Sequence, residues 1–306
     1  MKSYRYTVVD VFTKEPLVGN ALAVFPDAAG LDQTTMQKIA KELNLAETAF
    51  VLPATRKDCT ARLRIFTPCK EMAFAGHPTV GAAFVLWRNE AVPRRRALVL
   101  EEEIGPVPLR IEDSRRPMIW LRTPPISEGR CYDYSLCARA LGLEPQDLLP
   151  LKPQLLSAGN PTLFVAARDK PAVDRAWLDL AGIKTLKSAE NESFCVFVFT
   201  PTREGAYSRM FAPEYGVVED PATGSSTGPL AAYMIRHNLL ASGGTGTRLV
   251  NEQGTKMGRR SLLHVEVRAE ETGDAIYVGG YVTPVAEAVM TLDFDEEAHA
   301  AQQAEA

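Results

Sequence analysis

The sequence predicts an α/β protein of the α+β type, built from two pseudo-symmetric lobes that are each a mostly antiparallel sheet curled around one central helix. An internal repeat with a long period divides the 306 residues into two similar halves. An apolar, helix-like run follows each copy of the repeat, and short strand-like segments fill most of the remainder. We expect an active site between the two lobes.

The repeat relates residues 64–81, RIFTPCKEMAFAGHPTVG, to residues 209–224, RMFAPEYGVVEDPATG. The matched residues are Arg64, Phe66 and Pro68 with Arg209, Phe211 and Pro213, then His77, Pro78 and Gly81 with Asp220, Pro221 and Gly224. A weaker echo in the same order relates Gly19-Asn20 to Gly159-Asn160. Several matches in one order indicate a duplicated fold.

The repeat also sets the expected domain organisation. We expect an N-terminal lobe over 1–125, completed by a C-terminal strand over 284–296. A C-terminal lobe would then cover 126–283, and residues 297–306 would form a tail. The join between the lobes is expected near residues 123–135.

Most of each half has the composition of strands. The expected strands are short, rich in β-branched residues and mostly bounded by Pro, Gly or charged clusters. They are, in chain order, 7–12, 21–25, 97–103, 118–122, 194–200, 262–268 and 275–282. Residues 194–200, FCVFVFT, have almost no polar alternation, which predicts a strand buried on both faces.

Helices are fewer. Residues 34–44 place apolar side chains at helical spacing, with Asp32 as the expected N-cap. The other strong helical segments are 77–89 and 224–239. Shorter helices are expected at 133–141 and at 173–180, and residues 296–306 are expected to be a solvated helical end or a frayed tail.

Composition excludes several classes of function. The net charge of −4 and the single short basic run, Arg94-Arg95-Arg96, do not indicate nucleic-acid binding. The first ten residues lack the apolar core of a signal or anchor, and no window is apolar enough for a membrane helix. The five cysteines show no CxxC spacing and the four histidines no ligand spacing, so we expect reduced thiols, no metal and a cytoplasmic protein.

The two long apolar helices begin alike, with a polar residue, a proline and then a glycine. Free N–H groups and the helix dipole favour an anion at such a terminus. We therefore expect the termini at Gly76 to Thr79 and at Thr223 to Thr227 to hold a substrate carboxylate between them. His77 and Asp220 would lie symmetrically at the two helix mouths. The simpler interpretation makes Asp220 a helix cap and His77 a packing residue, but the duplication favours a shared site.

Glu47 is the second candidate, in NLAETAFVL at 44–52. Its neighbours in sequence are apolar, and burial raises the pKa of a carboxyl group. A raised pKa suits a general acid or base that works near neutral pH. A solvent-exposed glutamate is the alternative at this position. Neither SGGTGT at 242–247 nor DPATGSSTG at 220–228 has the context of a nucleotide-binding loop, and the GxSxG pattern is absent.

Together these blocks resemble a known family. NLAETAFV (44–51), the segment 64–81 and RMFAP…VEDPATGSS (209–226) resemble the signature blocks of the PhzF family, and residues 9–25 resemble its opening. The resemblance runs essentially from end to end. It implies the fold of diaminopimelate epimerase, with a catalytic cleft between two lobes. Those epimerases carry one cysteine at each helix mouth, where this chain has His77 and Asp220, so a two-thiol racemisation is not expected.

The resemblance also implies roles for individual residues. Glu47 matches the family's proton carrier, and His77 and Asp220 match its supporting polar residues. The residues expected to bind substrate are Gly76, Thr79, Thr223, Gly224 and Ser225. The implied reaction is a proton shift in a small carboxylic acid such as a dihydro-hydroxyanthranilate, with no metal or organic cofactor and with the chain as a homodimer. The alternatives are a racemase or epimerase on the same fold and a ligand-binding protein without catalysis.

Overall fold

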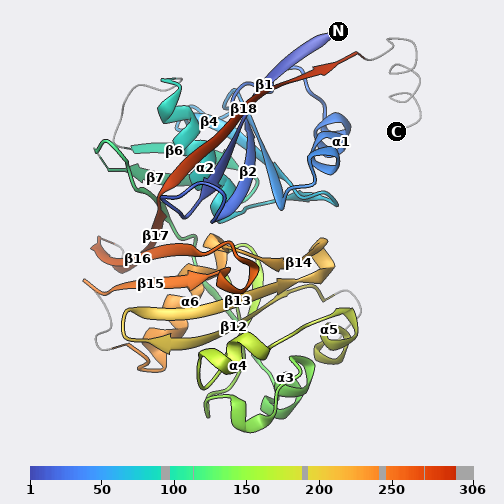
Figure 1. Ribbon diagram of the computed structural model, residues 1–306. Helices are drawn as coiled ribbons and strands as arrows, with labels where there is room; N and C mark the ends of the chain where they lie inside the picture. The colour runs from blue at the N-terminus through green and yellow to red at the C-terminus, as the bar shows by residue number, and fades with distance from the viewer. Residues whose placement is uncertain (91–96, 113, 188–191, 241–245, 272, 294–306) are drawn as a thin grey trace.

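The computed structural model describes residues 1–90, 97–112, 114–187, 192–240, 246–271 and 273–293. Figure 1 shows two lobes, the upper one formed by the blue and cyan part of the chain together with the red strand β18. The longer helices are α1 (Gln33–Leu43), α2 (Gly76–Arg88) and α6 (Gly224–Arg236). The short ones are α3 (Tyr134–Ala140), α4 (Lys170–Arg175), α5 (Leu180–Leu186), η1 (Pro145–Asp147), η2 (Pro213–Tyr215) and η3 (Thr255–Met257).

The first lobe is a sheet with the strand order β18, β1, β2, β3, β4, β6, β7, β8. Their bounds are β18 Val282–Leu292, β1 Lys2–Val11, β2 Asn20–Phe25, β3 Glu47–Leu52, β4 Ala61–Phe66, β6 Ala97–Glu102, β7 Gly105–Ile111 and β8 Ile119–Arg122. The short strand β5 (Glu71–Met72) pairs with β4. The strand that completes this lobe therefore comes from the far end of the chain.

The second lobe has the order β9, β10, β11, β12, β13, β15, β16, β17. Their bounds are β9 Ser127–Cys131, β10 Gln154–Ser157, β11 Pro161–Ala166, β12 Cys195–Thr202, β13 Gly205–Ala212, β15 Arg248–Gln253, β16 Ser261–Glu270 and β17 Gly273–Gly280. The short strand β14 (Val217–Asp220) pairs with β13, as β5 pairs with β4.

The two lobes have the same topology. The pairs β2–β3 and β4–β6 are parallel in the first lobe, and their counterparts β11–β12 and β13–β15 are parallel in the second. The remaining pairs in both lobes are antiparallel. The predicted fold class is confirmed. One feature was not foreseen: β8 pairs with β17, so the hydrogen-bonded ladder continues from one lobe into the other.

Each lobe curls around one central helix, α2 or α6, and both helices have 13 residues. Every residue of α2 from Gly76 to Leu86 is buried, as expected of a helix that is apolar on all sides. Side chains of β1, β2, β4 and β6 pack against it to form the core of the first lobe.

The predicted cap of α1 is confirmed, because Asp32 accepts a hydrogen bond from Thr35 N at 2.7 Å. The predicted helix over 173–180 is wrong. The chain forms α4 and α5 there, with residues 176–179 outside both. Asp179 caps α5, and the Arg209 guanidinium donates to the Ala176 carbonyl at 2.6 Å, just after α4 ends. These polar groups end one helix and start the next, which the apolar spacing of the segment does not reveal.

The tail at 297–306 and the last residues of the expected strand 284–296 lie outside the described residues. Within the described part of the chain, no helix is both long enough and apolar enough to span a bilayer.

Candidate active site

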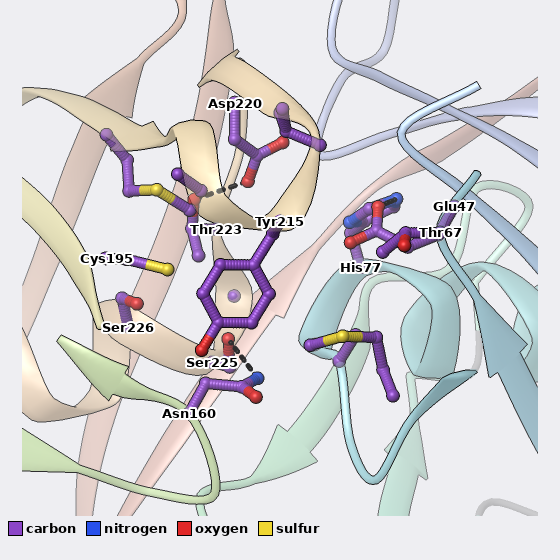
Figure 2. A pocket seen from close by; sticks show the side chains of 17 residues that line it. Glu47, Thr67, His77, Asn160, Cys195, Tyr215, Asp220, Thr223, Ser225 and Ser226 are labelled. Carbon is purple, nitrogen blue, oxygen red and sulfur yellow. Dashed lines mark hydrogen bonds and ion pairs between the residues drawn. The ribbon is translucent and has the colours of Figure 1, made fainter. Parts of the chain in front are cut away.

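A pocket lies between the lobes, where the two central helices begin. Figure 2 shows Glu47, Thr67 and His77 from the first lobe on one side and the second-lobe residues on the other, with Tyr215 in the foreground. Its empty volume is about 530 Å³. The lining residues are Glu47, Thr67, Met72, Ala75, Gly76, His77, Asn160, Cys195, Met210, Ala212, Tyr215, Val217, Asp220, Thr223, Gly224, Ser225 and Ser226.

The first residues of the two helices touch at the base of this pocket. A Cβ atom built on Gly76 would lie 2.6 Å from Ser225 N and 2.7 Å from Gly224 Cα. Only glycine therefore allows this approach of the two backbones. Neither α2 nor α6 has a side-chain hydrogen bond at its N-cap, so both present free N–H groups and positive dipole ends to one region.

The expected symmetry of His77 and Asp220 is not what the structure shows. His77 is the second residue of α2, whereas Asp220 ends β14, four residues before α6 begins. The N-cap of α6 is Thr223, so Asp220 is not a cap either. Matching Pro78 to Pro221 gave the wrong register for the repeat, because Pro78 lies inside the first turn of α2 and Pro221 lies before α6. The true counterpart of His77 is Ser225, the second residue of α6.

Strand register identifies the counterpart of Glu47. Leu22, two residues after Asn20, pairs with Glu47, and Thr162, two residues after Asn160, pairs with Cys195. Glu47 and Cys195 therefore occupy equivalent positions in the two lobes, and both line the pocket. The pocket is thus built from two equivalent halves, one from each lobe, and these halves carry different side chains.

Glu47 begins β3 and lies against His77. Its Oε2 is 3.1 Å from His77 Nε2, and the two side chains are 14% and 3% exposed. The two atoms are not aligned as a hydrogen bond, and neither has another hydrogen-bond partner among the described residues. Burial, and secondly the nearby charge of Asp220, raise the pKa of Glu47 well above its usual value.

His77 is neutral in this site. Burial lowers its pKa to about 3, so the imidazole holds no extra proton at neutral pH. Its Nδ1 lies 3.2 Å from Asn20 Nδ2, and its Nε2 faces Glu47.

Asp220 is buried but well supplied with donors. Its Oδ1 accepts from Asn20 Nδ2 at 2.7 Å, and its Oδ2 accepts from Thr223 Oγ1 at 2.5 Å. Gln253 holds this arrangement by donating to Thr223 Oγ1 at 2.9 Å and to the Asp220 carbonyl at 2.7 Å. Burial raises the pKa of Asp220, while the bonds from Thr223 and Asn20 oppose that rise.

The part of the pocket formed by Asn160, Ser225 and Cys195 is neutral. Asn160 Nδ2 donates to Ser225 Oγ at 3.3 Å and to the Phe74 carbonyl of the first lobe at 2.8 Å. Cys195 is a thiol there, because burial, and secondly the charge of Asp220, raise its pKa to about 12. The carboxyl groups of the described lining residues have other neighbours: Asp220 accepts from Asn20 and Thr223, and Glu47 faces His77.

Most of the predicted site residues meet in this pocket: Glu47, Gly76, His77, Asp220, Thr223, Gly224 and Ser225. Thr79 does not reach it. Thr79 is the fourth residue after the N-cap Ala75, and its buried hydroxyl lies 2.7 Å from the Ala75 carbonyl and 2.6 Å from Glu102 Oε1 of β6.

Sequence reasoning missed the roles of Asn20, Asn160 and Cys195. The recurrence of Gly-Asn at 19–20 and 159–160 was the available signal for the two asparagines. Within the described residues, no group of three or more His, Cys, Asp or Glu side chains is arranged to hold a metal ion.

Known proteins share these features. Residues 9–288 match the PhzC-PhzF family model, described as phenazine biosynthesis-like protein. The chain belongs to this family. It is 36% identical over 276 residues to the trans-2,3-dihydro-3-hydroxyanthranilate isomerase of Pseudomonas aeruginosa, and the match covers 89% of this chain and 93% of that protein. Other members of the family with similar identity are also named isomerases, so this PhzC-PhzF chain is an isomerase.

Solved structures agree with the family assignment. The PhzF family protein of Bacillus anthracis superimposes with a TM-score of 0.85 at 25% identity, over 95% of this chain and all of that one. A hydroxyproline epimerase from Agrobacterium vitis superimposes with a TM-score of 0.66 at 11% identity, over 96% of this chain and 94% of that one. The second similarity shows that the PhzC-PhzF fold is shared with epimerases.

Proposed function

We propose that this protein isomerises a small carboxylic acid by internal proton transfer, without a cofactor, and that Glu47 carries the proton. The observation that supports this most directly is the pair of Glu47 Oε2 and His77 Nε2, 3.1 Å apart in the pocket, with neither atom engaged in a hydrogen bond. The relatives' names indicate trans-2,3-dihydro-3-hydroxyanthranilate, or an acid very similar to it, as the substrate.

The substrate carboxylate would bind where the two helices meet. The N–H groups at the start of α6 and the Ser225 hydroxyl lie on the neutral half of the pocket, next to Asn160 Nδ2. Donors at a helix N-terminus bind an anion with both hydrogen bonds and the helix dipole. Among the described lining residues, the carboxyl groups of Glu47 and Asp220 lie against His77 and Asn20 and not against Asn160 or Ser225.

Apolar side chains form the rest of the wall. Met72, Met210, Ala212 and Val217 line the pocket beside the polar residues. They would contact the hydrocarbon part of the substrate and exclude water from it. Exclusion of water also disfavours the charged form of Glu47, and this makes its carboxylate a stronger base.

The proton shift needs one carrier. The Glu47 carboxylate would take a proton from a C–H bond, and the electron pair of that bond would move into the conjugated system of the acid. The protonated Glu47 would then give the same proton to another carbon, so the double bond moves and Glu47 returns to its first state. His77 N–H and the Asp220 carboxylate would orient the polar substituents of the substrate meanwhile.

Replacing Glu47 with glutamine tests this assignment. The amide cannot take up a proton, so turnover of trans-2,3-dihydro-3-hydroxyanthranilate, followed by its ultraviolet spectrum, should fall by roughly 10²–10⁴-fold or more. Thermal unfolding of Glu47→Gln should remain within a few degrees of the wild type. Glu42→Gln, on the exposed face of α1, is the matched control and should keep full activity. Near-full activity of Glu47→Gln contradicts the assignment.

The same assay in D₂O separates the alternatives. An isomerase moves a double bond and changes the absorption spectrum, whereas an epimerase inverts one stereocentre and introduces deuterium there. A binding protein retains the acid unchanged. Cys195, opposite Glu47, has a raised pKa and is a poor thiolate base, which argues against an epimerase that uses a pair of thiols.

We further propose that the protein acts in the cytoplasm as a homodimer, without binding nucleic acid. All five cysteines are unpaired, which suits a reducing compartment, and the net charge of −4 disfavours a polyanion. Val289 on the edge strand β18 is 58% exposed and Val285 is 38% exposed, as an unpaired apolar edge would be before a second copy covers it. Light scattering after size exclusion tests the dimer.

A further inference from the structure

Asn20 is not among the residues that line the pocket, yet its side chain contacts both His77 and Asp220, which do line it. It begins β2 in the first lobe and is 1% exposed. Its Nδ2 lies 2.7 Å from Asp220 Oδ1, 3.1 Å from the Ala222 carbonyl and 3.2 Å from His77 Nδ1. One amide nitrogen thus joins His77 of the first lobe to Asp220 of the second.

The position of Asn20 is itself fixed from both lobes. Gly19 has φ of +74°, and any Cβ there would lie 2.5 Å from the Val11 carbonyl. Arg259 of the second lobe donates to the Gly19 carbonyl at 2.7 Å and pairs with Asp10 at 2.5 Å. The backbone that carries Asn20 therefore has little freedom to rotate the amide away.

The neighbours determine which way the amide points. A carbonyl oxygen can only accept, so the atom of Asn20 next to the Ala222 carbonyl must be the nitrogen. Of its two hydrogens, one is taken by Asp220 Oδ1 at 2.7 Å, and the other is shared between the Ala222 carbonyl at 3.1 Å and His77 Nδ1 at 3.2 Å. A hydrogen on Nδ1 would place donor against donor at 3.2 Å, so Nδ1 must carry the lone pair. In a neutral ring the single hydrogen then lies on Nε2.

We infer that Asn20 is a positioning residue, which fixes His77 as the Nε2–H tautomer and so places the ring hydrogen on the nitrogen that lies 3.1 Å from Glu47 Oε2. The inference rests on the proposed role of Glu47 as proton carrier. In this tautomer Nε2 has no lone pair, so His77 cannot take a proton from Glu47. The proton therefore stays on Glu47 between the two carbons of the substrate, and His77 only orients the carrier.

The second lobe contains a natural comparison. Asn160 is the counterpart of Asn20, and each reaches across to the carbonyl just before the opposite helix cap, Phe74 for Asn160 and Ala222 for Asn20. Each also approaches the second residue of its own lobe's helix, which is Ser225 for Asn160 and His77 for Asn20. The two asparagines brace the lobes alike, but only Asn20 faces a ring.

The tautomer is measured by ¹⁵N NMR of the ring nitrogens in the full-length protein, with the His77 signals identified by their loss in His77→Gln. The wild type should show a neutral ring with hydrogen on Nε2. In Asn20→Asp the side chain keeps its size and shares one proton with Asp220, so the oxygen next to the ring can only accept and the ring hydrogen should move to Nδ1. With trans-2,3-dihydro-3-hydroxyanthranilate, kcat should fall by about 10²-fold while KM stays within about threefold.

Asn160→Asp is the matched control. It makes the same chemical change against Ser225, so the His77 ring signals should match the wild type. Its added carboxylate should repel the substrate and raise KM by about tenfold or more, with kcat changed much less. If Asn20→Asp does not fold, Asn20→Ser, which is too short to reach the ring, should show a mixture of both tautomers.

Hydrogen on Nδ1 in the wild type overturns the inference without any variant. So does an unchanged Nε2–H signal in Asn20→Asp or Asn20→Ser. If the wild type fails to convert the acid, the proposed function is wrong, whereas the ring signals still decide whether Asn20 sets the tautomer. The two failures are therefore distinguishable.

Discussion

At the residue scale, Glu47 and Asp220 are two carboxyl groups in one pocket with different surroundings. Donors reach both oxygens of Asp220, from Asn20 and from Thr223, and these bonds favour its charged form. No described donor is aligned on Glu47 Oε2. Of the two, Asp220 therefore holds the negative charge more readily, and Glu47 is the group whose proton is available for transfer.

The effect of the Asp220 charge on the pKa of Glu47 should be measurable. Because that charge contributes to the raised pKa of Glu47, Asp220→Asn should lower this pKa toward its usual value. Titration of the Glu47 carboxyl carbon by ¹³C NMR gives the result directly. Asp27→Asn, which lies on the surface, should leave the Glu47 titration where it is in the wild type. A Glu47 pKa that is unchanged or higher in Asp220→Asn would contradict this electrostatic account.

Glu102 is a second buried carboxyl group, outside the pocket. The Thr79 hydroxyl has one hydrogen, yet it lies 2.7 Å from the Ala75 carbonyl and 2.6 Å from Glu102 Oε1. That single hydrogen is shared between two acceptors, so it supports a charge on Glu102 only weakly. Burial raises the pKa of Glu102 to about 8 against the opposing effect of the Thr79 bond, so the carboxyl is protonated at neutral pH.

The free energy of unfolding should consequently depend on Glu102. Between about pH 4.5, where the unfolded carboxyl ionises, and about pH 8, the folded state holds a proton that the unfolded state has lost. Stability from this group is thus complete at low pH and falls as the pH rises, by at most about 1.4 kcal/mol per pH unit. Urea unfolding at pH 5, 6.5 and 8 should show a smaller fall for Glu102→Gln than for the wild type. The exposed neighbour variant Glu103→Gln should behave as the wild type does.

At the scale of the elements, the two central helices are positioned by their first residues. The contact of Gly76 with the backbone of Gly224 and Ser225 leaves no room for a methyl group. The backbone cannot yield as a side-chain end can, so the lobes would have to separate at the base of the pocket.

Gly76→Ala should therefore destabilise the protein by about 1–3 kcal/mol and reduce kcat. Gly81→Ala in the same helix is the control, because its added methyl meets only the side chains of Leu22, Val11 and Val9. Denaturant unfolding should show the smaller loss for Gly81→Ala, and activity should be retained. Equal activity in both variants would show that the helix mouths tolerate separation.

Local pattern predicted most of these elements. The apolar runs of α2, α6 and β12 and the Asp32 cap of α1 were visible in sequence, because burial and capping act over a few residues. The register of the repeat could not be predicted from the sequence, because proline is tolerated both within the first turn of α2 and before α6. Two contacts depend on strand pairing between distant segments, which local pattern does not report. They are the contact of Glu47 with His77 and that of Asn20 with Asp220.

At the scale of the whole molecule, the first lobe depends on the far end of the chain. β18 pairs with β1 along its full length, from Val282 opposite Val11 to Leu292 opposite Lys2, and Figure 1 shows it as the red strand across the blue lobe. The ladder between β8 and β17 then joins the two sheets. The lobes should accordingly unfold together and not one after the other.

Truncation tests this dependence. A chain that ends at Tyr281 lacks β18 and leaves β1 as a bare edge, so it should fail to give the cooperative thermal transition of the full chain. A chain that ends at Asp293 keeps all of β18 and should unfold at the same temperature as the full chain within a few degrees. Two separate transitions in the full chain, measured by calorimetry, would contradict the coupling.

The difference between the two halves of the pocket has a consequence for the stereochemistry of the proposed reaction. Glu47 belongs to the first lobe, whereas Cys195, at the equivalent position of the second lobe, is a neutral thiol. If Glu47 is the single proton carrier, as we propose, the hydrogen would leave one carbon and arrive at the other on the same face of the molecule, and the shift would be suprafacial. A stereospecifically deuterated substrate would retain part of its label in the product, delivered on the side from which it was removed.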